Sequence, residues 1–214
     1  MDIKKLKINI GGYTIIEMMI AISIFLIVIS IGMNGLLQSN LVLNKSRDMR
    51  NIMDNLSFVM EDMSRSIRTG YKYRCFDEGL IWENSYIQDG SLEIPRSCAL
   101  GHAIAFEEAT TGNVGEAKDQ WIYRFGFDER TGGFTIYKSI NGGLNFYPLT
   151  DSKIVFDQTS GISVLAAEPQ DADPVNDGQP FVIIRLSGYI EFKGIKTPFN
   201  LQTSVSQTLI DITI

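Results

Sequence analysis

The chain has 214 residues, 44% of them hydrophobic, and a formal net charge of −6. The acidic balance argues against a broadly basic nucleic-acid-binding surface, and the length allows one ordinary domain besides an anchoring segment. One histidine and two cysteines give little material for a catalytic or metal-binding constellation.

A short basic segment, residues 1–12, comes first. It contains Lys4, Lys5 and Lys7 and ends in the pair Gly11-Gly12. Positive charge beside an apolar run favours retention on the cytoplasmic side of a membrane. A secretory signal peptide has its small-residue cleavage site after the apolar region. Here the small residues come before it, so cleavage after Gly12 would leave the apolar run on the mature chain.

The apolar run extends from Ile15 to Met33 and is interrupted only by Glu17, Ser23, Ser30 and Gly32. As a helix it would be roughly 28 Å long, which is enough to cross a bilayer core. The run alone also fits a plain single-pass signal anchor. An ionised carboxylate in a lipid-facing helix costs about 2.5 kcal/mol or more, so Glu17 is a candidate functional residue.

The junction Gly12-Tyr13-Thr14-Ile15-Ile16-Glu17 resembles the processing site of type IV pilins and pseudopilins. The resemblance implies that a prepilin peptidase cleaves the Gly12–Tyr13 bond and methylates the amino group of Tyr13, where most members have Phe. It also implies that Glu17 pairs with the first residue of a neighbouring subunit during assembly. The implied partners are other pilin subunits, the peptidase, an inner-membrane assembly platform and membrane lipid.

An amphipathic pattern begins at Met49, where apolar residues recur at spacings of three and four. Its members are Met49, Ile52, Met53, Leu56, Val59, Met60, Met63 and Ile67. We expect one nearly continuous helix over residues 13–69, with a transmembrane half at 13–35 and an amphipathic half at 36–70. Gly70 is a natural stop, because glycine tolerates the left-handed conformation at a helix end.

Strand-like runs dominate residues 71–214, an exported domain of ordinary size. We expect strands at 102–106, 120–127, 134–140, 144–149, 153–156, 162–166, 181–186, 189–192 and 201–205, with hairpin turns at 131–133 and 141–143. Pro148 places its strand at an edge or ends it early. The expected fold class is α+β, with an antiparallel sheet packed on the amphipathic half of the helix. The pilin resemblance implies the same arrangement.

Both cysteines, Cys75 and Cys98, lie in this exported domain. An even count outside the cytoplasm favours a disulfide, and two free buried thiols are the alternative. A metal site built from these cysteines and the distant His102 is not favoured, and we expect no cofactor.

The loop 168–180 has three prolines and four acids, and its oxygen atoms are candidate Ca²⁺ ligands. A solvated loop is the favoured interpretation, because the spacing does not match an EF-hand.

Removal of residues 1–12 lowers Lys and Arg from 19 to 16 and acids from 25 to 24, so the mature net charge is −8. A DNA partner is therefore not favoured, although Lys72 and Arg74 near Arg68 form a local basic group. No nucleophile elbow, phosphate-binding glycine loop or zinc motif is present, and we expect no enzymatic activity.

The resemblance implies a minor pilin or pseudopilin of a type IV pilus-like filament or a type II secretion pseudopilus. Such a subunit is held in the inner membrane before assembly, with its C-terminal domain outside, and afterwards lies in a surface or periplasmic filament. The segment 199–205 is similar to carboxy-terminal strands of J-type and related large minor pilins. The alternatives are an anchored binding module or adhesin that does not polymerise, and an anchored hydrolase.

Overall fold

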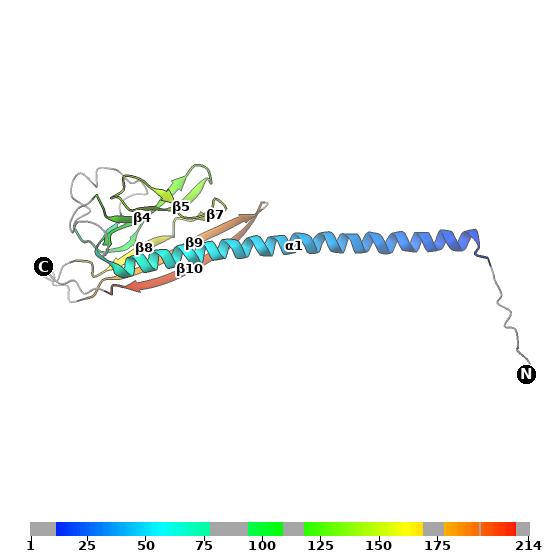
Figure 1. Ribbon diagram of the computed structural model, residues 1–214, viewed down its shortest axis with the longest axis horizontal. Helices are drawn as coiled ribbons and strands as arrows, with labels where there is room; N and C mark the ends of the chain where they lie inside the picture. Colours follow the sequence, from blue (N-terminus) through cyan, green and yellow to red (C-terminus); the bar gives the residue numbers. More distant parts are fainter. Residues whose placement is uncertain (1–11, 78–93, 109–117, 169–177, 193, 209–214) are drawn as a thin grey trace, which may run out of the picture. The chain divides into compact units, whose positions relative to one another are not determined.

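The computed structural model describes residues 12–77, 94–108, 118–168, 178–192 and 194–208 (Figure 1). The layout is α+β, with one long N-terminal helix followed by an antiparallel sheet. The chain divides into two compact units, Met1–Asp48 and Met49–Ile214, and the helix contributes residues to both.

The helix α1 spans Ile15–Thr69. By length and composition it is long and apolar enough to cross a membrane. Gly32 and Gly35 lie inside it, and a Cβ atom at either position would meet nothing within 4 Å. Packing within this chain therefore does not require these two glycines.

The part of α1 in the second unit buries one stripe against the sheet. Ile52, Leu56, Val59, Met63 and Ile67 are all buried and belong to the main hydrophobic core. Their spacing of three and four matches the helical period. The amphipathic pattern predicted from Met49 onward is therefore confirmed.

The helix ends as predicted at Thr69, and the chain passes directly into a strand. The Tyr73 hydroxyl lies 2.5 Å from the Ile67 carbonyl oxygen and 2.7 Å from that of Gly70, at the point where the helix leaves carbonyl groups unpaired. Gly70 is required by space, because a Cβ atom there would collide with the Phe106 ring.

Ten strands form one sheet in the described part of the chain. They are β1 (Gly70–Phe76), β2 (Cys98–Gly101), β3 (Ala103–Glu108), β4 (Trp121–Asp128), β5 (Gly133–Ser139), β6 (Tyr147–Pro148), β7 (Ile154–Phe156), β8 (Gly161–Leu165), β9 (Phe181–Phe192) and β10 (Ile195–Ser206).

The main path of the sheet runs β1-β3-β4-β5-β7-β9-β8-β2, and its two ends meet. Cys75 of β1 and Cys98 of β2 form a disulfide with a Cα–Cα distance of 5.7 Å. The Cys75 amide donates to the Arg96 carbonyl at 2.9 Å, and the Arg96 amide donates to the Tyr73 carbonyl at 3.0 Å. The sheet therefore curls on itself, and the disulfide joins its terminal strands.

Several strand boundaries differ from the predicted ones. β1 and β2 were not predicted, and the segments expected at 181–186 and 189–192 form the single strand β9. The run expected at 144–149 pairs only as Tyr147–Pro148, in agreement with an early end at the proline. The glycines of the two predicted turns, at 132, 142 and 143, have positive φ angles, and both turns are confirmed.

Candidate functional site

The start of α1 places the predicted cleavage site outside the helix. Gly12, Tyr13 and Thr14 are not helical, and α1 begins at Ile15. An extended peptide is the form that a protease active site can take up, whereas a helical one must first unwind. The bond between Gly12 and Tyr13 therefore lies in backbone that needs no unwinding.

Thr14 caps the helix. Its hydroxyl oxygen accepts a hydrogen bond from the Glu17 amide at 3.3 Å, and its carbonyl accepts one from the Met18 amide at 3.3 Å. Thr14 and Glu17 have the Thr-x-x-Glu spacing of a capping box, but only the bond from the Glu17 amide to the Thr14 hydroxyl is formed. The capping role of Thr14 was not predicted, although the spacing can be read from the sequence.

Glu17 is the only charged side chain of the apolar run Ile15–Met33. The Ser23 and Ser30 hydroxyls each donate to the carbonyl four residues earlier, at 2.7 Å. The Glu17 carboxylate makes no ion pair or side-chain hydrogen bond with any residue in the described ranges. A carboxylate in an apolar medium needs such a partner.

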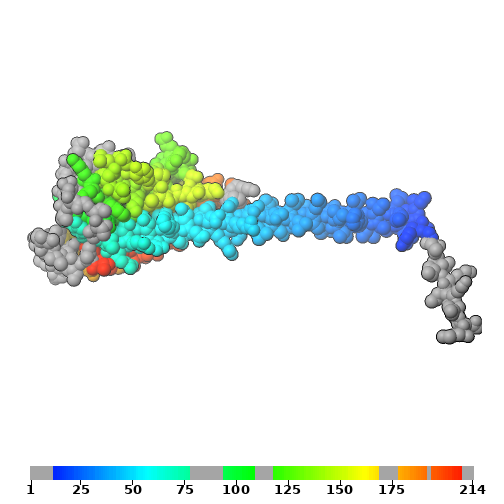
Figure 2. All heavy atoms as spheres, in the orientation of Figure 1, coloured from blue at the N-terminus to red at the C-terminus, as the bar shows by residue number. Residues whose placement is uncertain are grey.

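The apolar side chains around Glu17 are all exposed. The large hydrophobic side chains from Tyr13 to Leu43 are between 41% and 84% exposed, whereas the first buried one in α1 is Ile52. Figure 2 shows this part of the helix in blue, with its side chains on the surface. An exposed apolar surface of this extent marks a membrane-facing or partner-facing segment.

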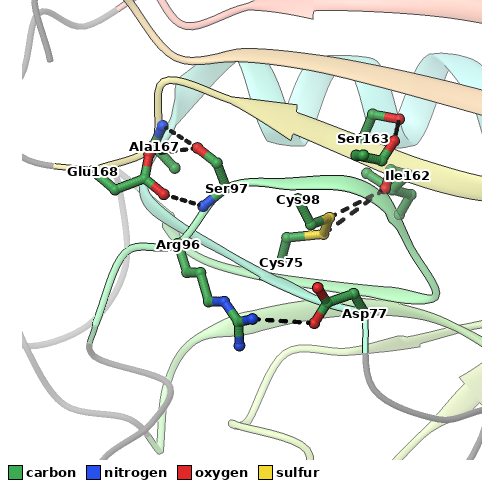
Figure 3. The surroundings of a disulfide bond; sticks show 10 residues. Cys75, Asp77, Arg96, Ser97, Cys98, Ile162, Ser163, Ala167 and Glu168 are labelled. Carbon is green, nitrogen blue, oxygen red and sulfur yellow. Dashed lines mark hydrogen bonds and ion pairs between the residues drawn. A yellow bond between two sulfur atoms is a disulfide. The ribbon is translucent and has the colours of Figure 1, made fainter. Parts of the chain in front are cut away.

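A polar network lies beside the disulfide (Figure 3). Glu168 accepts hydrogen bonds from the Ser97 amide at 2.6 Å and the Ser97 hydroxyl at 2.5 Å, and Ser97 Oγ accepts one from the Ala167 amide at 2.9 Å. Burial alone would raise the pKa of Glu168, but the hydrogen bonds from Ser97 outweigh it, so the pKa is lowered. This network ties the end of β8 to the segment before β2.

A second polar contact joins α1 to the sheet. The Tyr123 hydroxyl donates to Asp62 at 2.8 Å, and Lys138 donates to the same carboxylate at 2.9 Å. Burial raises the pKa of Tyr123, and the negative charge of Asp62 adds to the rise. Both contacts tie the amphipathic part of α1 to β4 and β5.

The remaining candidates do not converge on a site. Among the described residues, no three His, Cys, Asp or Glu side chains are placed to hold a metal ion. Most of the loop considered for calcium, residues 169–177, lies outside the described part of the chain. His102 has a buried Nδ1 atom without a hydrogen-bond partner in the described part of the chain.

Comparison with known proteins gives no relative. No protein-family model, curated protein or solved structure matches this chain. Function must therefore be argued from the residues and their geometry.

Proposed function

We propose that this protein is a structural subunit, a minor pilin or pseudopilin, of a type IV pilus-like filament or a type II secretion pseudopilus. The observation that carries the proposal is the arrangement around Glu17. This carboxylate lies in the first turn of α1, has no partner in the described chain, and is surrounded by exposed apolar side chains.

Processing would supply the missing partner. Cleavage of the Gly12–Tyr13 bond creates a new, positively charged amino group on Tyr13, four residues before Glu17. A carboxylate and an ammonium group in a low-dielectric environment attract strongly, and each is costly to leave alone there. Pairing of Glu17 with Tyr13 of a neighbouring copy would draw subunits into one register as they leave the membrane.

The basic leader and the disulfide both favour export of the sheet domain across the inner membrane. Lys4, Lys5 and Lys7 favour a cytoplasmic location for the leader, so the sheet domain lies on the opposite side of the membrane. A disulfide between Cys75 and Cys98 is typical of such an oxidising compartment. We therefore place the subunit in the inner membrane before assembly and in the filament afterwards.

The proposal is tested by the location of the full chain in cells that produce filaments. Shearing releases surface filaments and leaves inner-membrane proteins behind. We expect the chain in the sheared fraction when prepilin peptidase is active, and only in the membrane fraction when the peptidase is inactive.

A chain that stays in the membrane fraction and keeps residues 1–12 with active peptidase would contradict the proposal, whereas a processed chain in that fraction would fit a periplasmic pseudopilus. The first of these results would favour the other candidate, an anchored binding module or adhesin that does not polymerise.

A further inference from the structure

The strand β10 leaves one edge of the sheet open. It pairs with β9 over all twelve residues, Ile195–Ser206, without a register shift. No described strand pairs with its other edge. In Figure 1, β10 borders the sheet in red. Such an edge presents unpaired amide and carbonyl groups that can template another strand, and proteins usually protect it with charges, prolines or bulges.

Protection of this edge is limited to its first residues. Lys196 and Pro198 lie near the start of β10, and from Phe199 to Ser206 the strand has no charge, proline, glycine or bulge. Eight residues of regular, uncharged edge are therefore available for pairing.

Two observations identify the backbone groups that point outward. Pro198 has no amide hydrogen yet lies within the regular ladder, so its nitrogen faces the open edge. The Gln207 amide donates to the Pro180 carbonyl at 3.2 Å, so odd-numbered residues point towards β9. The amides of the even-numbered residues Asn200, Gln202 and Ser204 therefore point outward.

The two faces of β10 differ in polarity. Phe199 and Val205 are buried in the main core and Leu201 is packed against it. The even-numbered side chains of Asn200 and Ser204 are exposed on the opposite face. A strand added to this edge must therefore alternate apolar residues on the core face with polar residues on the outer face.

Residues 210–214 of this chain have that alternation, and Leu209 precedes them. Residues 209–214 read Leu-Ile-Asp-Ile-Thr-Ile, with isoleucine at 210, 212 and 214 and polar residues at 211 and 213. As a strand, six residues extend about 20 Å. This length matches most of the unprotected edge.

The same copy cannot supply this strand through a tight hairpin. A two-residue turn would have to use Gln207 and Thr208. The Gln207 amide instead extends the ladder to Pro180, and the Thr208 amide donates to the Arg68 carbonyl of α1 at 3.0 Å. The chain thus continues past the end of β10 towards α1.

We propose that residues 209–214 of one copy add as a strand to the open edge of β10 in a second copy of this chain. Each copy then offers one donor segment and one acceptor edge, so the contact is head-to-tail and can continue from copy to copy. The inference rests on the sheet edge and stands whether or not the chain is processed at Gly12.

The test is cross-linking of the full chain in detergent micelles. One preparation carries Asn200→Cys on the acceptor edge, and the other carries Thr213→Cys on the donor segment. Both native cysteines are in the disulfide and do not react. The two preparations are mixed and treated with a short bismaleimide. We expect a covalent dimer in this mixture and at least tenfold less dimer from either preparation alone.

Other outcomes overturn the proposal. Dimer from the Asn200→Cys preparation alone would show β10 pairing with β10. An internally cross-linked monomer of the double variant, without dimer in the mixture, would show the tail on its own chain. Absence of any cross-link would show that the edge stays open.

Two substitutions check that strand addition produces the dimer. Ser204→Pro in the acceptor removes an outward amide and no β9 hydrogen bond, and Ser204→Thr is its matched control. We expect the proline variant to lower the dimer yield at least tenfold and the threonine variant to leave it unchanged. Ile212→Asp in the donor should lower the yield as well. Unchanged yield with Ser204→Pro or with Ile212→Asp would overturn the proposal.

Discussion

Lys138 of β5 donates hydrogen bonds to both carboxylate oxygens of Asp62 of α1, at 3.1 and 2.9 Å. The Tyr123 hydroxyl donates to the same carboxylate, and the Lys138 ammonium lies 4.3 Å from the centroid of the Trp121 ring. Apolar contacts tolerate small rotations of a helix, whereas this directional contact does not. We infer that it fixes the rotation of the amphipathic part of α1 on the sheet.

We expect Asp62→Ala to lower the free energy of unfolding by about 2 kcal/mol. The substitution removes the carboxylate that accepts from half-buried Lys138 and from the Tyr123 hydroxyl. Glu61→Ala is the matched control, since its ion pair with Arg65 is 69% and 79% exposed, against 28% and 16% for Asp62 and Lys138. The exposed pair should contribute about 0.5 kcal/mol or less. Urea denaturation in detergent micelles measures both losses, and equal losses would contradict the proposed role of Asp62.

The disulfide should contribute more than either ion pair. Cys75 and Cys98 are separated by 23 residues in sequence, and closing a loop of that size in the unfolded chain stabilises the fold by about 3 kcal/mol. We expect the double variant Cys75→Ala, Cys98→Ala to lose that amount in urea denaturation. A reducing agent should destabilise the native chain by a similar amount and have no effect on the double variant. If the reducing agent also destabilised the double variant, the loss of stability in the native chain could not be assigned to the disulfide.

Stability should fall with rising pH above about 10. Burial, followed by the hydrogen bond to Glu107 and its negative charge, raises the pKa of Tyr71 from 10.0 to about 12. Above pH 10 the unfolded tyrosine loses its proton while the folded one keeps it, so the unfolded state binds fewer protons and is favoured as the pH increases. The free energy of unfolding of Tyr71→Phe should decline less between pH 10 and 12 than that of the native chain. Identical slopes would contradict the raised pKa.

The charge of Glu17 and the cap of Thr14 can be separated by substitution. Glu17→Ala and Glu17→Gln should both be processed and inserted into the membrane but fail to enter filaments, because neither can pair with a charged amino terminus. Thr14→Val removes only the hydroxyl that accepts the Glu17 amide and should reduce assembly less than either Glu17 variant. The measurement is the ratio of each variant in sheared filaments to that in membranes. Normal incorporation of Glu17→Gln would show that the charge of Glu17 is not needed for assembly.

The helix was predictable because its signals are local. The apolar run and the three-and-four spacing from Met49 can be read within windows of a few turns, and Gly70 marks the end. The observed helix begins at Ile15 and not at Tyr13, because Thr14 serves as its cap. The Thr-x-x-Glu spacing indicates a helix start at this point. It was not used for that prediction, because Glu17 was interpreted only as a charge in a membrane segment.

The sheet was less predictable because its strands depend on distant partners. β9 continues through Gly188, where the two predicted strands were separated. A side chain at this position would collide with the Val155 carbonyl of β7, so the glycine allows close strand contact and does not end the strand. β1 carries mixed polar and apolar residues and β2 is only four residues long, and the disulfide and the neighbouring strands hold both in place. β10 extends through Pro198 because its nitrogen faces the open edge.

The central claim is most directly tested by the intact mass of the full chain after co-expression with an active prepilin peptidase, with an inactive peptidase as control. We expect the mass to fall by that of residues 1–12 and to rise by one methyl group, with Tyr13 as the new amino terminus, only with the active enzyme. A full-length chain in both preparations would contradict the account and leave α1 as a plain membrane anchor.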